Sequence, residues 1–411
     1  MKQQRMRRYK SSLEREYSDN NLWNTNAISP GTKFMNKLNI SLKNHIKKYK
    51  NIILDDSDNR GEGEHKILHY IKNNNLKGKI CIYGLDADLI QLSLVSRKEN
   101  IVLLRETTEY NIEKTKSEYI YLKIDDLKKH LIKSLNISRI VDKNRIIDDY
   151  IFLCFLLGND FMNHIPSLNL RYGCHDILLN IYSKLQERYG GYFRLIDYKQ
   201  DNFIHMTFFK EYINELSLIE DNMINKTKMI RFKQYKKTLE NYQNIFIDYK
   251  NFCKNICKNK SENLLENIYQ FQYNISENKT NVKKMIENLP ILYSQEDDYE
   301  EKYNNKSCED YMKSLLWTTH YYFNDCINWR FCSDFKHGPC LKNLSKFLIN
   351  NKIEIYKDNN EFSNLEQLSY IFPTDSHILH NYSIKDRKYK LILDFSHSRY
   401  LWECNIDFIS Y

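Results

Sequence analysis

One stretch decides the fold of this chain: KICIYGLDADLIQLSLV, residues 79–95. Its first five residues form a compact apolar run that predicts a buried strand, and the apolar spacing from Asp88 onward predicts a helix. A second apolar run, residues 101–105, predicts another strand. Because short strands alternate with helical segments, the pattern indicates an α/β fold with a mainly parallel sheet flanked by helices.

The segments outside this unit add mostly helices. Helical periodicity predicts helices over residues 3–17, 34–49, 64–73, 145–157 and 311–323. A short apolar run at residues 52–54 predicts one more strand, and the polar stretch SQEDDYEEKYNN, residues 294–305, indicates a flexible insertion. The rest of the C-terminal part mixes short strands and helices, including an element near residues 388–395.

The change of character beyond about residue 190 suggests three domains. We expect an α/β domain over residues 1–190, a helical, Lys/Asn-rich connecting region over 191–310, and a region of mixed helix and strand over 311–411. The second part of the chain is thus predicted to be mostly helical with short strands.

The composition excludes several classes of protein. Of 411 residues, 42% are hydrophobic and 28% charged, which rules out a wholly disordered or collagenous chain. The longest apolar run, Tyr150 to Leu157, is far shorter than the roughly 20 residues that span a bilayer. The opening MKQQRMRRYK lacks the apolar core of a secretory signal. We therefore expect an intracellular protein, cytoplasmic rather than nuclear, with reduced thiols.

The charge and the cysteines leave the partner open. The net charge of +9 permits a polyanionic partner, but a solvated Lys-rich surface explains it equally well. Heavy use of Asn, Ile, Lys and Tyr is typical of an AT-rich genome, so single lysines carry little information. The ten cysteines are scattered without a CxxC pair, and a zinc site is not expected.

Three segments concentrate acids beside glycines: GEGEHK at 61–66, YGLDADL at 83–89 and LGNDF at 157–161. Each alone has an ordinary explanation as a helix start or a turn. Together, each at the end of an element, they predict one site made of Glu62, Glu64, Asp86, Asp88 and Asp160. Carboxylates with few histidines suit Mg²⁺ or Mn²⁺, and two such ions about 4 Å apart can cleave a phosphodiester.

These three segments, in this order, resemble the catalytic region of the 5′→3′ exoribonucleases of eukaryotic RNA decay and, more distantly, flap endonucleases. The match extends to QQRMRRY at 3–9, ISPGTKFMNKL at 28–38, the aromatic-rich segment 311–339 and FSNLEQLSYIFPTDSHIL at 362–379. It covers nearly the whole chain and is weakest over about 190–310. The resemblance implies a PIN- or flap-nuclease-like catalytic domain that degrades single-stranded RNA with a 5′-monophosphate.

The resemblance also assigns roles to residues. It makes the five carboxylates metal ligands, and it places the 5′-phosphate pocket at Gln4, Arg7 and Arg8. Those three residues share one face of the predicted N-terminal helix, and paired arginines can grip a terminal phosphate with bidentate geometry. An exposed basic helix is the ordinary alternative for them.

Some features depart from the family. The family has a segment before the QQR helix with a first strand, two further metal-binding aspartates and a pocket lysine, so we expect an N-terminally incomplete catalytic core. The family's Trp-x-Trp pair reads Trp329-Arg330-Phe331, which leaves Trp329 and Phe331 as base-stacking candidates. Trp317, Tyr321 and Tyr322 lie at helical spacing and are predicted to be core.

Two other functions stay open. The missing aspartates favour a catalytically inactive RNA-binding remnant, whereas the five acids together fit a working site better. A flap-type, structure-specific DNA nuclease would use the same chemistry. Against it, HIPSLN follows Asp160 at residues 164–169, where flap nucleases generally place a helix-hairpin-helix motif.

Overall fold

The computed structural model describes residues 25–74, 76–84, 86–107, 117–135, 137, 142–227, 229–230, 298–335, 338–371, 389–394 and 405–410. The helices are η1 (Thr25–Ala27), α2 (Lys33–Ile46), α3 (Gly63–Asn73), α4 (Asp88–Val95), α5 (Ile124–Ser134), α6 (Lys143–Phe155), η2 (Leu170–Tyr172), α7 (Cys174–Arg188), α8 (Met206–Ser217), α12 (Asp298–Phe323), α13 (Leu341–Asn350) and α14 (Asn364–Ile371). The strands are β1 (Ile80–Tyr83), β2 (Ile101–Glu106), β3 (Tyr119–Lys123), β4 (Tyr389–Asp394) and β5 (Asn405–Ser410).

The unit predicted from residues 79–105 is present. The two predicted strands are β1 and β2, which pair in parallel with Ile82 opposite Leu103, and α4 begins at Asp88 between them. Ile82, Ile101 and Leu103 are buried, because alternate residues of a strand point to the same face. α4 and α5 pack on this apolar face of the sheet.

The sheet is mixed, and the prediction of a mainly parallel sheet is wrong for the described strands. β3 pairs with β2 in the antiparallel sense, with Leu122 opposite Leu103. Antiparallel neighbours need no crossover helix, and Thr107 N–H continues the ladder to the carbonyl of Glu118. Tyr83 and Tyr121, which share the opposite face, are 57% and 69% exposed. Helices therefore cover one face of this sheet in the described part of the chain.

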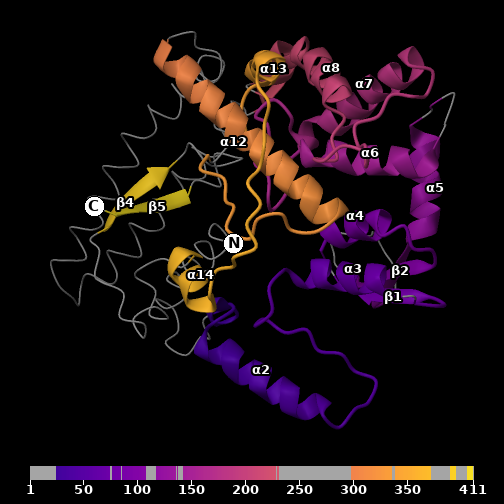
Figure 1. The fold of residues 1–411 in the computed structure, drawn as a ribbon, viewed down its shortest axis with the longest axis vertical. Coiled ribbons are helices and arrows are strands. Elements are labelled where there is room, and N and C mark those ends of the chain that lie inside the picture. The colour runs from indigo at the N-terminus through magenta and orange to yellow at the C-terminus, as the bar shows by residue number, and fades with distance from the viewer. Residues whose placement is uncertain are drawn as a thin grey trace, which may run out of the picture.

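Helix α6 is the centre of the hydrophobic core. Asp142 caps its first turn by accepting the N–H groups of Asn144 and Arg145 at 2.9 and 3.4 Å. Phe152 and Phe155 on this helix are fully buried. Burial of one such side chain contributes roughly 1.5–3 kcal/mol. Figure 1 shows α6 between the sheet region and the layer of α7 and α8.

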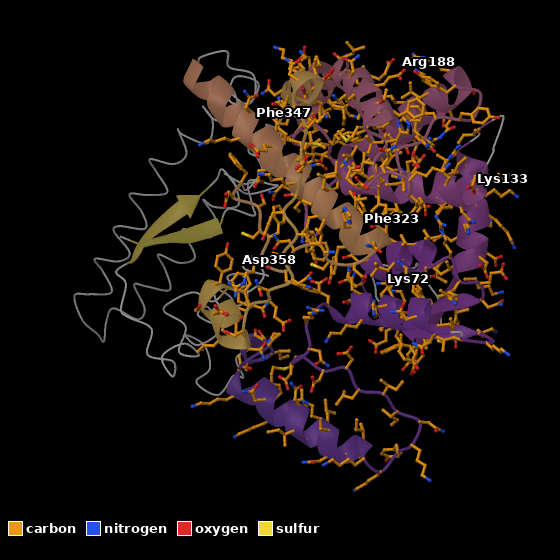
Figure 2. All side chains as sticks on the ribbon, viewed as in Figure 1. Lys72, Lys133, Arg188, Phe323, Phe347 and Asp358 are labelled. Carbon is orange, nitrogen blue, oxygen red and sulfur yellow. The ribbon has the colours of Figure 1, made fainter. Side chains whose placement is uncertain are left out.

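Helix α12 crosses the molecule diagonally, from the region of α13 to the region of α4 (Figure 1). It packs against α4 and α6 near its C-terminal end and against α13, which in turn packs on α8. Figure 2 labels Phe323 at the end of α12 and Lys72 near the end of α3. The ammonium of Lys72 donates to the carbonyl of Tyr322 at 3.4 Å, so the two helix ends meet there.

Helix α2 lies apart from this core (Figure 1). Thr32 caps it by accepting from the N–H of Met35 at 3.3 Å. Gly31 has a φ of +85°, and a Cβ on it would lie 2.9 Å from the Cβ of Asn364 in α14. The Pro30-Gly31 turn therefore needs glycine both for its backbone conformation and for the close approach of α14.

Several of the predicted elements are confirmed, and two further predictions, besides the mainly parallel sheet, are wrong. The helices predicted over 34–49, 64–73, 145–157 and 311–323 correspond to α2, α3, α6 and the second half of α12, and β4 lies within 388–395. The predicted strand 52–54 is an unpaired coil, with Ile53 71% exposed, because no described strand pairs with it. Residues 298–305 of the predicted flexible insertion are the first turns of α12.

Other predictions lie partly or wholly outside the described residues. The N-terminal helix predicted over 3–17 lies wholly outside them, and so does most of the predicted connecting region over 191–310. The seven described cysteines are all free thiols. Among the helices that the structure describes, none combines the length and apolarity needed to cross a bilayer.

Candidate active site

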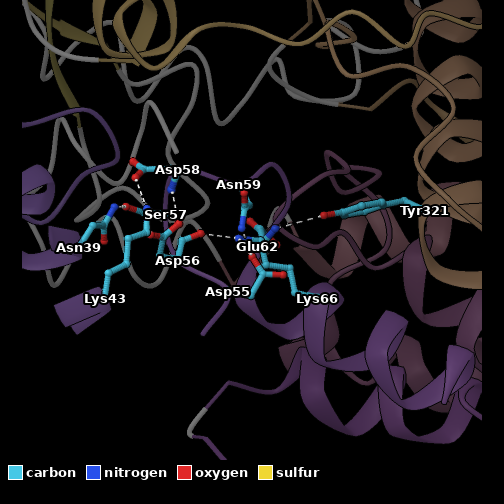
Figure 3. Close-up of polar contacts among 10 residues, drawn as sticks. All are labelled: Asn39, Lys43, Asp55, Asp56, Ser57, Asp58, Asn59, Glu62, Lys66 and Tyr321. Carbon is cyan, nitrogen blue, oxygen red and sulfur yellow. Dashed lines mark hydrogen bonds and ion pairs between the residues drawn. The ribbon is translucent and has the colours of Figure 1, made fainter. Parts of the chain in front are cut away.

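The N-terminal end of α3 carries two acids. Glu62 is the N-cap residue, with extended backbone angles, and Glu64 lies in the first turn. The backbone N–H of Glu62 donates to the hydroxyl of Tyr321 in α12 at 3.4 Å, a contact drawn in Figure 3. A helix N-terminus carries partial positive charge, which stabilises carboxylates held there. The GEGE motif thus places both acids at one end of a packed helix.

The N-terminal end of α4 carries the second pair. Asp86 follows β1, and one of its carboxylate oxygens accepts the backbone N–H of Asp88, the first residue of α4, at 3.3 Å. Asp86 is exposed, whereas Asp88 is half-buried. The DAD motif therefore turns the chain from strand to helix and presents one half-buried and one exposed carboxylate at the carboxyl end of β1.

A tight turn after α6 presents Asp160. The side-chain carbonyl oxygen of Asn159 accepts the N–H groups of Phe161 and Met162 at 2.9 and 2.8 Å. Gly158 has a φ of +82°, and a Cβ on it would lie 2.9 Å from the backbone of His164. The glycine and the asparagine of the GND motif build this turn, which leaves the Asp160 side chain exposed.

The acids of the three segments interact with one another. Burial, followed by repulsion from Glu64, Asp160 and Asp88, raises the pKa of Glu62 to about 7. Burial, followed by repulsion from Asp86 and Asp160, raises the pKa of Asp88 to about 6. Like charges gathered in a low-dielectric place produce this pattern. The five acids predicted from the sequence therefore form one electrostatic group, although they come from three distant segments.

The donor set suits a hard divalent cation, but the side chains are not at coordinating distances. Within the described ranges, no group of three or more His, Cys, Asp or Glu is spaced to hold a metal ion. Clustered carboxylate oxygens are nevertheless the ligands that Mg²⁺ and Mn²⁺ prefer, and a cation would relieve the repulsion that raises the pKa values of Glu62 and Asp88. The chemistry of these residues therefore fits the divalent cation that the sequence predicts.

A cluster of aromatic rings holds the acid-bearing segments together. The imidazole of His65, next to Glu64, stacks on the ring of Tyr321 with centroids 3.6 Å apart and planes at 14°. Phe161, next to Asp160, meets His65 edge-on at 5.9 Å, and Tyr322 meets it edge-on at 5.1 Å. Burial lowers the pKa of His65 to about 3, so this ring is neutral. The stack fixes α3, the GND turn and α12 relative to one another.

The two base-stacking candidates lie at the edge of this aromatic cluster. Trp329 is half-buried, with its ring edge-on to Tyr321 at 6.1 Å and the Arg60 guanidinium carbon 5.2 Å from its ring centroid. Phe331 stacks on Trp317 at 6.3 Å and 26°. Trp329 thus neighbours the residues that lead into Glu62, and Phe331 lies one ring further along the cluster.

A second group of acids precedes the site and has the opposite electrostatics (Figure 3). The Lys43 ammonium lies 2.7 Å from a carboxylate oxygen of Asp56 and 3.1 Å from one of Asp58. The Lys66 ammonium contacts Asp55 at 2.9 Å and donates to the carbonyl of Asp56 at 2.6 Å. Although burial opposes them, hydrogen bonds from Lys66 to Asp55 and from Lys43 to Asp56 hold the pKa values of both acids below their usual range. We call residues 55–58 the paired acids.

Some of the residues predicted for the site are described by the structure and others are not. Gln4, Arg7 and Arg8 lie outside the described residues, so their pocket stays a prediction. Tyr321 and Tyr322 are buried, as predicted for core residues, and Trp317 is partly buried. What the sequence did not indicate is that both tyrosines contact the acid-bearing segments. Their only signal was two adjacent tyrosines on an apolar helix, which predicts burial but not neighbours.

Comparisons with known proteins give a consistent family. The family model described as "XRN 5'-3' exonuclease N-terminus" matches residues 1–107, and the one described as "Xrn1 helical domain" matches 140–310 and 292–383. The chain is 36% identical over 194 residues to 5'-3' exoribonuclease 2 of Yarrowia lipolytica, covering 41% of this chain and 19% of that protein. It is 24% identical over 457 residues to 5'-3' exoribonuclease 2 of Gallus gallus, covering 86% and 48%.

A third relative, 5'-3' exoribonuclease 2 of Schizosaccharomyces pombe, is 29% identical over 307 residues, which is 59% of this chain and 30% of that protein. The chain belongs to the XRN family of 5′→3′ exoribonucleases of eukaryotic RNA decay. It spans about half the length of the Gallus gallus relative and less of the other two.

Proposed function

We propose that this chain is a divalent-cation-dependent 5′→3′ exoribonuclease that degrades 5′-monophosphorylated RNA to nucleoside 5′-monophosphates. The observation that carries the proposal is the group of mutually repelling carboxylates at the ends of β1, α6 and the start of α3. Burial and the repulsion among these acids raise the pKa values of Glu62 and Asp88, and perturbed carboxylates of this kind are typical of functional sites. The family to which the chain belongs supports the choice of RNA as substrate.

The residues that would hold the cations are Glu62, Glu64, Asp86, Asp88 and Asp160. A bound divalent ion supplies positive charge that acidifies an attacking water and stabilises the leaving oxygen of a phosphodiester. The ends of α3 and α4 orient four of the acids, and the Asn159 turn orients the fifth. The aromatic cluster around His65 and Tyr321 excludes water from one side of the group.

Different residues would recognise the 5′ end of the RNA and its bases. Gln4, Arg7 and Arg8 would hold the 5′-phosphate, because a terminal monophosphate carries nearly two charges at neutral pH and an internal phosphate carries one. Trp329, half-buried beside the acids, would stack on a base, and Phe331 would lie further along the strand. A pocket that prefers a monophosphate end gives the enzyme its 5′→3′ direction.

A second candidate function is RNA binding without catalysis. It is favoured by the absence, among the described residues, of three acids at coordinating distances. In that case the basic helix and the aromatic residues would bind RNA, and the repelling acids would be a remnant.

One experiment separates the two functions. Purified chain is incubated with RNA carrying a 5′-monophosphate or a 5′-hydroxyl, with Mg²⁺ or with EDTA. The proposal predicts release of nucleoside monophosphates from the 5′-monophosphate RNA alone, and only with Mg²⁺. Binding of both RNAs without release of nucleotides would support the non-catalytic function. Release that is equal for the two RNAs would contradict the assignment of Gln4, Arg7 and Arg8.

A further inference from the structure

Tyr322, near the end of α12, is a buried tyrosine whose ring is held firmly in place. Its side chain is fully buried, and its ring lies edge-on to Phe155 at 4.8 Å and to His65 at 5.1 Å. These contacts fix the direction of the phenol. The hydroxyl group is buried and has no well-formed hydrogen bond in the structure, although it lies within reach of the Asp88 carboxylate. A buried hydroxyl without a partner destabilises a fold, so its presence at this position calls for a reason.

The surroundings of this hydroxyl supply the reason. The Tyr322 ring meets His65, next to Glu64, at 5.1 Å and Phe161, next to Asp160, at 6.3 Å, and its helix packs against α4, which begins at Asp88. In agreement with this position, burial and then interactions with Asp88, Glu62 and Asp160 raise the pKa of the Tyr322 phenol. The three acids come from α4, from the start of α3 and from the GND turn, so the hydroxyl faces the point where these segments meet. An ionised carboxylate only accepts hydrogen bonds, so the phenol is the donor to Asp88 when that acid is ionised.

We propose that Tyr322 is a positioning residue of the carboxylate site: its hydroxyl donates a hydrogen bond to Asp88 and holds that carboxylate in the orientation that binds a divalent cation. This inference rests on the proposed function, because it assigns Asp88 to the cation. One carboxylate oxygen of Asp88 is then tied to the protein, and the other is left for the ion. Partners that orient a metal ligand in this way typically contribute about 10- to 100-fold to metal affinity.

Tyr311 offers a matched control on the same helix. It lies about three turns earlier in α12, is 3% exposed and also has a buried hydroxyl without a hydrogen bond. Burial alone raises the pKa of Tyr311, with no contribution from a carboxylate. Its ring lies beside Gly338, where a Cβ would come within 3.2 Å of it. Tyr311→Phe therefore removes the same atom from the same helix, away from the acids.

The test measures Mn²⁺ binding to the full chain by electron paramagnetic resonance, without RNA, for the wild type, Tyr322→Phe and Tyr311→Phe. Thermal unfolding of the same samples reports folding. We expect Tyr322→Phe to weaken Mn²⁺ binding by about tenfold with little change in Tm, because the phenylalanine ring keeps the packing and only the hydroxyl group is lost. Tyr311→Phe should bind Mn²⁺ like the wild type.

The outcomes separate the inference from the proposed function. Equal Mn²⁺ affinity in the wild type and Tyr322→Phe would overturn the role of Tyr322 and leave the cation site standing. Equal weakening in Tyr311→Phe would attribute the effect to the packing of α12 and would also overturn it. A wild-type chain that binds no Mn²⁺ would overturn the proposed cation site, and the role of Tyr322 with it.

Discussion

The paired acids of residues 55–58 and the carboxylate site that begins at Glu62 are neighbours in sequence and opposites in electrostatics. Lys43 and Lys66 hold the pKa values of Asp55 and Asp56 below the usual range, whereas burial and repulsion raise those of Glu62 and Asp88. Acids that are matched by lysines stabilise the fold. Acids that face one another without such partners destabilise it, and proteins keep groups of that kind at functional sites.

The largest expected effect separates the two groups by activity. Asp88→Asn should reduce cleavage of 5′-monophosphorylated RNA by about 100- to 1000-fold, because it removes a carboxylate from the charge-stabilising site. Asp58→Asn, the same change in the paired acids, should leave the rate within about twofold. Among the residues drawn in Figure 3, the side chain of Asp58 contacts only Lys43. Initial rates measured with both variants check this. Equal losses would show that the two groups do not differ in function.

The next effect concerns stability and the paired acids. Lys66→Met should lower the free energy of unfolding by about 1–2 kcal/mol, because the part-buried carbonyl of Asp56 loses its donor. Denaturant unfolding of the wild type and the variant measures the change. The stabilisation that Asp55 and Asp56 contribute is present above the pKa of about 4 that they have in the unfolded chain. It is lost as the pH falls through their lower pKa values in the folded chain. An unchanged midpoint would mean that this contact does not hold the loop.

A smaller effect of opposite sign is expected at Glu62. Glu62→Gln should raise the free energy of unfolding at pH 8 by about 1 kcal/mol, because it removes a charge from a repelling group; this figure allows for solvent screening. The folded pKa is raised, so the wild type loses stability as the pH rises from about 4.5 to about 7, and the gain should vanish below pH 4. Unfolding at pH 4 and pH 8 checks the sign. A loss of stability at pH 8 would show that Glu62 is not in a repelling group.

The sequence predicts the local elements well and the long-range contacts poorly. The strand at residues 79–83 and the helix from Asp88 carry their own periodicity, and β1 and α4 appear where that periodicity places them. The run at residues 52–54 has the same apolar character, yet a strand forms only where a partner strand binds it, and none does within the described residues. β3 was not among the predicted elements, although its Tyr and Ile residues favour a strand, and the local sequence does not encode the antiparallel pairing with β2 that makes the sheet mixed.

The candidate site also has features that local sequence predicts and features that it does not. Its acids stand beside glycines at element ends, and from this local pattern the five acids were predicted to lie together. The structure shows that they interact electrostatically, and their role as metal ligands stays a prediction. The approach of Tyr322 to Asp88 depends on how α12 packs against α4, and neither segment encodes that contact by itself. The stacking of His65 on Tyr321 is of the same kind. Both contacts depend on tertiary packing between residues far apart in the sequence.

The most direct measurement is the titration of the side-chain carboxyl carbons by ¹³C NMR, with Glu62→Gln and Asp88→Asn used to assign the two signals. Without divalent cations, Glu62 should titrate with a pKa of about 7 and Asp88 with a pKa of about 6, and saturating Mg²⁺ should lower both because the ion neutralises the repulsion. Titration of both groups near their ordinary values of about 4, unchanged by Mg²⁺, would contradict a cation-binding carboxylate site in this protein.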